Sequence, residues 1–221
     1  MTSGKSDLAK SLDGVQGQLR PVLKDGGFRA RDRTFNRTTS DGLTEVVKIQ
    51  MGSFDPPGTT YVPGLRENLY GKFTINLGIF VPEVAEQNGG GAPKSFVQEY
   101  HCCIRTRLPV LGPEGRDVWW DIQAHESLAH DLRQRIERDA IPFFKKFETR
   151  DAILKQWLGV SKAPYASSPP RIVCAIILAG RGQKEDARIL LAAQARETSI
   201  PGHAAHVRRL ADKLGVADLA W

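Results

Sequence analysis

The chain has 221 residues, of which 41% are hydrophobic and 25% are charged, and its formal net charge is +6. This composition excludes a disordered or fibrous protein, and the length fits one domain with an appendage. The longest apolar run, residues 172–179, is too short to cross a bilayer, the N-terminus lacks an apolar signal segment, and three cysteines make no disulfide framework. We therefore expect a cytoplasmic protein that binds no membrane.

The N-terminal segment has the periodicity of an amphipathic helix. Leucine and valine recur at three- and four-residue steps from Leu8 to Leu23, and the pattern ends at Gly26 and Gly27. Pro21 is expected to kink or restart this helix. Basic residues outnumber acidic ones in residues 20–37, so this segment forms either an anion-attracting patch or a solvated basic edge.

Four stretches are predicted to be strands: residues 28–38, 43–51, 72–81 and 99–108. Polar and apolar residues alternate without a break in 72–79, which is typical of a half-buried strand. Residues 39–42 fit a hairpin turn, while the loops around 56–58 and 89–91 are longer and are expected to be mobile. An antiparallel meander is the simplest arrangement of these strands.

The strand parities divide the side chains between a core face and an outward face. In 99–108 we expect Tyr100 and Cys102 to face the core with Ile104, Thr106 and Leu108. The outward face then combines cationic, amide and hydroxyl groups, namely Lys48, Gln50, Lys72, Thr74, Asn76, His101, Arg105 and Arg107. Such a face could bind something anionic, although a solvated sheet face has the same appearance.

Helical patterns resume after Trp119 and Trp120. A covering helix is predicted from an apolar stripe that Pro142 interrupts, formed by Leu128, Leu132, Ile136, Phe143 and Phe147. Thr149 is expected to cap a short helix that carries Ile153 and Trp157 and ends at Gly159.

The C-terminal third is predicted to be a helical extension. We expect a domain over 1–159, a linker over 160–170 and helices over 171–221, because 160–170 is rich in proline and serine. Ala175, Leu178, Gly182, Ala187 and Leu191 have the spacing of one tetratricopeptide-like helix pair. One unit cannot stack into a solenoid, so a docked helical hairpin is expected, followed by one more helix.

Histidine and glycine spacings argue against metal and phosphate sites. His125 and His130 are five residues apart, which places their rings roughly 140° apart on a helix, whereas a zinc-protease helix needs them four apart. His203 and His206 could share a face, but no Cys or carboxylate cluster accompanies them. The glycine runs at 89–91 and 180–182 lack the remainder of a nucleotide-binding motif. We expect no metal and no cofactor.

Cysteine and histidine adjoin each other at residues 101–103. Adjacent strand residues face opposite ways, so Cys103 would share the outer face with His101 while Cys102 turns inward. Residues two apart on a strand are separated by roughly 6.5 to 7 Å, which a hydrogen bond does not span without a bulge. Cys103 is therefore the one candidate nucleophile, in a geometry that disfavours catalysis.

The order of several segments resembles a bacterial family of domains of unknown function, DUF4304. The resembling segments are Gly27-Phe28, Phe35–Arg37, Val47–Gln50, Phe73–Gly78, His101–Leu108 and Trp119-Trp120, within roughly residues 5–158. The resemblance rests on hydrophobic spacing and the tryptophan pair. It implies an α+β fold and supplies no catalytic residues. Some families of this style act as immunity proteins beside toxins, which is an analogy at the level of size and style.

The sequence predicts an α+β protein with a four-stranded, mainly antiparallel sheet covered by helices and a C-terminal helical hairpin. We hypothesise a non-catalytic protein-interaction module that binds an acidic protein surface through its sheet face or its helical tail. The expected binding residues are Lys48, Lys72, Asn76, His101, Arg105, Arg107, Trp119 and Trp120. A nucleic-acid-binding protein and a thiol-dependent enzyme stay open as alternatives, although the predicted face lacks aromatics for stacking bases.

Overall fold

The computed structural model describes residues 6–52, 68–87, 93 and 96–217. The expected mobile loops at 56–58 and 89–91 lie outside these residues. The chain forms two compact units, each assembled from three stretches of sequence. Unit 1 comprises Met1–Arg37, Val46–Leu77 and Thr106–Lys145; unit 2 comprises Thr38–Glu45, Gly78–Arg105 and Lys146–Trp221.

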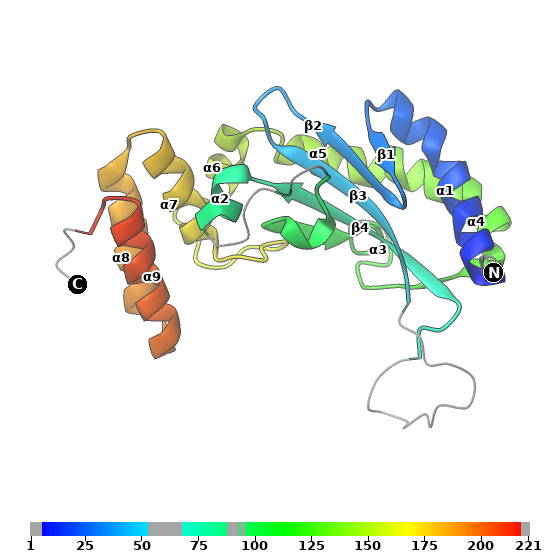
Figure 1. The fold of residues 1–221 in the computed structure, drawn as a ribbon. Coiled ribbons are helices and arrows are strands. Elements are labelled where there is room, and N and C mark those ends of the chain that lie inside the picture. The colour runs from blue at the N-terminus through cyan, green and yellow to red at the C-terminus, as the bar shows by residue number, and fades with distance from the viewer. Residues whose placement is uncertain (1–5, 53–67, 88–92, 94–95, 218–221) are drawn as a thin grey trace, which may run out of the picture. The chain divides into compact units, whose positions relative to one another are not determined.

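The described strands form one sheet (Figure 1). They are hydrogen-bonded in the order β1 (Arg29–Arg31), β2 (Thr34–Thr38), β3 (Thr44–Met51), β4 (Lys72–Phe80) and β5 (Ile104–Arg107), and β6 (Trp120–Asp121) pairs with β4. The β1–β2 and β4–β6 pairs are antiparallel. The predicted turn between β2 and β3 is present, with the Thr39 amide donating to the Leu43 carbonyl at 2.9 Å. The α+β class is confirmed, with more strands than the predicted four.

The additional strands have local causes. Asp32 adopts a left-handed backbone with φ of 51°, a conformation that aspartate tolerates better than most residues, and this turn divides the predicted first strand into β1 and β2. The two-residue strand β6 follows Trp119, where the sequence showed no alternation long enough to recognise. Its register places Trp120 opposite Phe73.

Strand β4 corrects the expectation of a half-exposed strand. Every residue from Phe73 to Phe80 is buried, including Thr74 and Asn76, which were predicted to face outward. The Thr74 hydroxyl donates to the Val118 carbonyl at 3.3 Å, and the Asn76 amide donates to Gln50 Oε1 at 2.7 Å. The polar positions of the alternating pattern therefore bond to neighbouring protein groups, because buried polar atoms need such partners.

The predicted fourth strand is correct only in its second half. Residues Glu99–His101 form a 3₁₀ turn, η1, and β5 begins at Ile104. The alternation of faces requires extended backbone, so a helical turn breaks it. Tyr100 is consequently 60% exposed instead of buried, whereas Glu99 and both Cys102 and Cys103 are buried.

Unit 1 contains the predicted N-terminal helix and the predicted covering helix. Helix α1 (Asp7–Asp25) buries Leu12, Val15, Leu19 and Leu23, continues through Pro21, and packs along α4 (His125–Arg135). A π-helical turn, η3 (Ile136–Ala140), joins α4 to α5 (Ile141–Lys146). Pro142 has no N–H to donate within this helix, so one helical hydrogen bond is missing at this point. The irregular turn directly before Pro142 is consistent with that loss. Unit 1 also contains the short helices α3 (Leu108–Leu111) and η2 (Ile122–Ala124), whereas α2 (Pro82–Gln87) belongs to unit 2.

Unit 2 contains the C-terminal helices. They are α6 (Arg150–Trp157), α7 (Pro170–Gly180), α8 (Lys184–Glu197) and α9 (Pro201–Lys213), and Figure 1 shows α8 and α9 side by side. Thr149 caps α6 as predicted, its hydroxyl accepting from the Ala152 amide at 3.0 Å. Helix α7 packs against α2, α6 and α8, and α8 packs against α9. Within the described chain, no helix is both long enough and apolar enough to span a membrane.

An ion pair in unit 1 predicts a specific response to acid. Both carboxylate oxygens of Glu114 accept from the Arg135 guanidinium, at 2.6 and 2.7 Å, and these bonds lower the pKa of Glu114 to about 2. Because this pKa is depressed on folding, its stabilisation is present above the ordinary value of 4.5 and is lost as the pH falls from 4.5 towards 2. Urea unfolding should therefore show Glu114→Gln about 1 kcal/mol less stable than the wild type at pH 7, an amount reduced by solvent screening, with the difference shrinking by pH 3.

The matched control is Glu185→Gln, which breaks the exposed Glu185–Arg188 pair one helical turn apart in α8. We expect no measurable effect on unfolding. A stability difference for Glu114→Gln that stays constant from pH 7 to pH 3 would contradict the assigned ion pair.

Candidate interaction groove

Arg107, predicted to bind a partner, is enclosed by groups of its own unit. Its guanidinium donates to the Asp117 carboxylate and, through Nε, to Asn76 Oδ1 at 3.2 Å. Its central carbon also lies 5.0 Å from the centroid of the Trp119 ring, a cation–π distance. Three of the predicted binding residues, Asn76, Arg107 and Trp119, are therefore brought together, in a partly exposed cluster in which Arg107 is already paired with Asp117.

The other predicted residues of unit 1 differ in their burial. Trp120 is buried with its ring centroid 5.6 Å from that of Phe73, so it is a core residue. Lys48 and Lys72 are only partly exposed. The interleaved polar groups of the predicted face thus contribute mainly to packing and hydrogen bonding inside this unit.

Arg105 and His101, in unit 2, are engaged within their own loop. Arg105 Nε donates to Glu99 Oε1 at 2.7 Å, which neutralises a glutamate that is largely buried. The His101 Nδ1 accepts from the Gln98 amide at 3.0 Å and closes the turn that precedes β5. Both side chains hold the local fold.

The thiols of unit 2 are poor candidates for chemistry. Cys103 was predicted to share an exposed face with His101, and this prediction is wrong. Cys103 is buried, and the backbone at His101 forms a 3₁₀ turn instead of a strand. Burial raises the pKa of the Cys103 thiol to about 12 and that of Cys174 to about 12, and it raises the pKa of Cys102 as well. A nucleophilic cysteine needs an accessible thiolate, and these environments favour the neutral thiol.

The described histidines and acids offer little to a metal ion. No group of three or more His, Cys, Asp or Glu side chains is placed to hold one in the described parts of the chain. The rings of His203 and His206 have centroids 6.3 Å apart. Desolvation, followed by the nearby His203, Arg209 and Lys213, lowers the pKa of His206, and the cations Arg209 and Lys213 would also repel a metal ion.

Unit 2 has an apolar groove with a volume of about 490 Å³ at the junction of α6, α7 and α8. Leu158 and Ile189 line it and are 57% and 50% exposed, respectively, so large apolar side chains face solvent. The remaining lining residues are Asp151, Leu154, Gly159, Leu178, Arg181, Gln183, Asp186 and Leu190. We call this set the α6–α8 groove.

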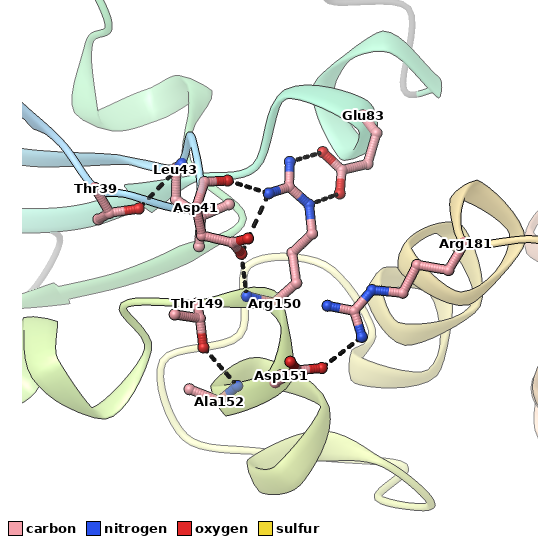
Figure 2. A network of polar contacts seen from close by, with 9 residues as sticks. All are labelled: Thr39, Asp41, Leu43, Glu83, Thr149, Arg150, Asp151, Ala152 and Arg181. Carbon is pink, nitrogen blue, oxygen red and sulfur yellow. Dashed lines mark hydrogen bonds and ion pairs between the residues drawn. The ribbon is translucent and has the colours of Figure 1, made fainter.

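Helix α6 is held in place by a polar network (Figure 2). The Arg150 guanidinium donates to both oxygens of Glu83 in α2, at 2.6 and 2.9 Å, and to the Asp41 carbonyl. The Asp41 carboxylate accepts from the Arg150 amide at 2.6 Å. Three segments distant in sequence, namely the β2–β3 turn, α2 and α6, are thereby joined at the first residue of α6, which fixes one wall of the groove.

The groove has a charged rim. Arg181, which caps the C-terminal end of α7, forms an ion pair with Asp151 in the first turn of α6, and Figure 2 shows the two side chains pointing toward one another. Asp186 lies in the first turn of α8. Each charge suits the helix end at which it lies, because helix N-termini favour anions and C-termini favour cations.

Comparison with known proteins identifies part of the chain. Residues 64–146 match the family model described as a domain of unknown function, DUF4304. This segment is similar to that family. The DUF4304 match is shorter than the resemblance predicted over 5–158, and it retains the segments at 73–78 and 101–108 and the tryptophan pair. Comparisons with curated proteins and with solved structures found no match.

The groove lies outside the DUF4304 segment, since its lining residues fall between 151 and 190. The sequence analysis did not identify it. The sequence predicted a short helix ending at Gly159 and a helical hairpin near Ala187 and Leu191, and it gave no role to Leu158 or Ile189. A signal was present in the second case, because Ile189 lies off the buried stripe formed by Ala187, Leu190 and Leu191 in α8.

Proposed function

We propose that the protein is a non-catalytic protein-interaction module whose α6–α8 groove binds an acidic amphipathic helix of a protein partner. The carrying observation is the pair of exposed apolar side chains, Leu158 and Ile189, on the rim of an apolar groove. This proposal adopts the helical-tail version of the predicted interaction, because the described cations Arg105 and Arg107 of the sheet-face version are already paired.

Exposed apolar side chains around a concavity favour a partner. Single exposed leucines are ordinary on protein surfaces, but Leu158 and Ile189 adjoin a groove that also contains Leu154, Leu178 and Leu190. Burying a leucine or isoleucine side chain contributes roughly 1.5–3 kcal/mol. Two such residues can therefore anchor a helix that presents apolar residues at i, i+3, i+4 and i+7.

The openness of the groove favours a protein segment over a small molecule. Sites for small molecules bury most of the ligand surface within concave walls. Here Leu158 and Ile189 are at least half exposed, so a small ligand would leave much of its surface in water. A helix covers such a groove with one face and leaves its polar face solvated.

The charge of the surrounding segment favours an acidic partner. Residues 151–190 carry six Lys or Arg and three Asp or Glu. Lys155 follows the lining residue Leu154 in α6, and Lys184 follows the lining residue Gln183. These two lysines and Lys162 are exposed, and they form no ion pair with any residue that the structure describes. These lysines would raise the association rate of an acidic helix, an effect that salt should weaken.

The proposal is tested by selecting displayed 16-residue peptides against the full chain and measuring their affinities by fluorescence anisotropy. We expect enriched peptides to be acidic and to carry apolar residues at helical spacing. Leu158→Asp and Ile189→Asp should each weaken binding at least tenfold, because each places an unpaired charge in an apolar contact.

Ile200→Asp is the matched control, since Ile200 is an exposed isoleucine of the same unit that does not line the groove. Its affinity for the peptides should equal that of the wild type. Equal loss in all three variants would contradict the groove assignment. Tight, salt-sensitive binding of an oligonucleotide that Leu158→Asp leaves unchanged would instead favour the nucleic-acid alternative.

A further inference from the structure

Resting on the proposed function, we propose that Arg181 binds a carboxylate of the partner helix and that Asp151 occupies this position in the free protein. The groove is apolar along most of its lining, and among the described lining residues Arg181 is the one with a positive charge. An arginine at the edge of an apolar groove can fix the register and direction of a bound helix through hydrogen bonds to a carboxylate.

Arg181 has hydrogen-bonding capacity to spare. A guanidinium carries five N–H donors. The Arg181 side chain makes one hydrogen bond to the described residues, from Nη1 to Asp151 Oδ1. Arg150, in the same unit, instead binds both oxygens of Glu83 and two groups of Asp41. Arg150 is therefore saturated and structural, whereas Arg181 can exchange its single bond to Asp151 for two bonds donated to another carboxylate.

Asp151 can be replaced on Arg181 by a carboxylate of the partner. The Asp151 side chain is 81% exposed, so its release into water carries little desolvation cost, while Arg181 is 33% exposed and is oriented by the end of α7. A partner carboxylate would replace one hydrogen bond by two in the water-excluding contact formed when the groove is covered. Asp151 thus competes with the partner for the same guanidinium.

This competition predicts opposite effects for the two members of the pair. Asp151→Asn should raise the affinity for a selected glutamate-containing peptide about fivefold, because the competing charge is removed. Arg181→Gln should lower that affinity about tenfold and should also abolish the preference for the peptide over its Glu→Gln counterpart. The readout is a double-mutant cycle between protein and peptide, measured by anisotropy at two salt concentrations.

Asp186→Asn is the matched control, because it removes the same charge from the same rim without touching Arg181. Asp186→Asn should change the affinity for the peptide by less than twofold. Equal gains for Asp151→Asn and Asp186→Asn would overturn the exchange proposal, since they would reflect net charge alone. Retained Glu preference in Arg181→Gln would overturn it too.

The outcomes separate this inference from the proposed function. Peptide binding that is lost in Leu158→Asp but unaffected by Arg181→Gln refutes the carboxylate contact and leaves the groove proposal intact. Peptide binding that Leu158→Asp does not change refutes both. Displacement of the peptide by decanoate at micromolar concentration would overturn the assignment of the carboxylate to a protein partner and assign it to a small amphipathic acid.

Discussion

Replacing Trp157 by alanine should lower the free energy of unfolding by about 4 kcal/mol, the middle of the range for a large buried aromatic residue. Trp157 is the last residue of α6 and is 2% exposed. Its ring packs edge-on against Phe147, with centroids 5.8 Å apart and an interplanar angle of 63°. The loss combines the transfer of apolar surface, the cavity left behind and the aromatic contact.

Urea unfolding followed by far-UV circular dichroism measures this loss without relying on tryptophan fluorescence. Trp157→Phe should retain more than half of the stability that alanine removes, because a phenyl ring fills part of the cavity. Leu158→Ala is the neighbouring control, since Leu158 is exposed and should change unfolding by less than about 0.5 kcal/mol. A similar loss in Trp157→Ala and Leu158→Ala would show that the core of unit 2 does not include Trp157.

Arg150→Ala should be the second large effect, with a loss of about 2 kcal/mol in the free energy of unfolding. Removing one partner of a fully buried ion pair costs about 3–5 kcal/mol, and partial solvent exposure of this pair lowers that amount. The substitution leaves the Glu83 carboxylate without its bidentate donor and the Asp41 carbonyl without its guanidinium. Because this network fixes the start of α6, the variant should also weaken peptide binding in the groove (Figure 2).

Arg188→Ala is the appropriate comparison, since Arg188 also binds both oxygens of a glutamate, Glu185, but on the exposed surface of α8. Thermal unfolding should separate the two variants, with Arg150→Ala melting several degrees lower and Arg188→Ala melting with the wild type. Equal melting temperatures for both variants would contradict a structural role for the Arg150 network.

The elements predicted correctly are those that local sequence specifies. The periodic apolar stripe of α1, the Thr149 cap of α6 and the turn at 39–42 each depend on residues within a few positions of one another. Such features can be recognised in the sequence, because capping and helical periodicity involve residues that are close to one another along the chain. Strand alternation was less reliable, since the helical turn at 99–101 and the left-handed Asp32 both interrupt it.

The candidate site could not be predicted in the same way. Arg105 and Arg107 were expected to be available to a partner, yet their carboxylate partners, Glu99 and Asp117, are six and ten residues away in sequence. The apolar groove combines residues from α6, α7 and α8, and no short motif joins them. The division into a domain, a linker and a helical extension, with its tetratricopeptide-like pair, stays a prediction.

The sequence by itself determined the α+β class, the positions of most helices and the lack of a recognisable catalytic motif, because these follow from composition and from short-range periodicity. The tertiary structure decided which polar residues are satisfied internally and which apolar residues stay exposed. That decision depends on contacts between distant segments, such as Arg150 with Glu83 and Asp41, and on the burial of both faces of β4. The free energy of burying a side chain depends on the groups that surround it, and these groups come together only in the folded chain.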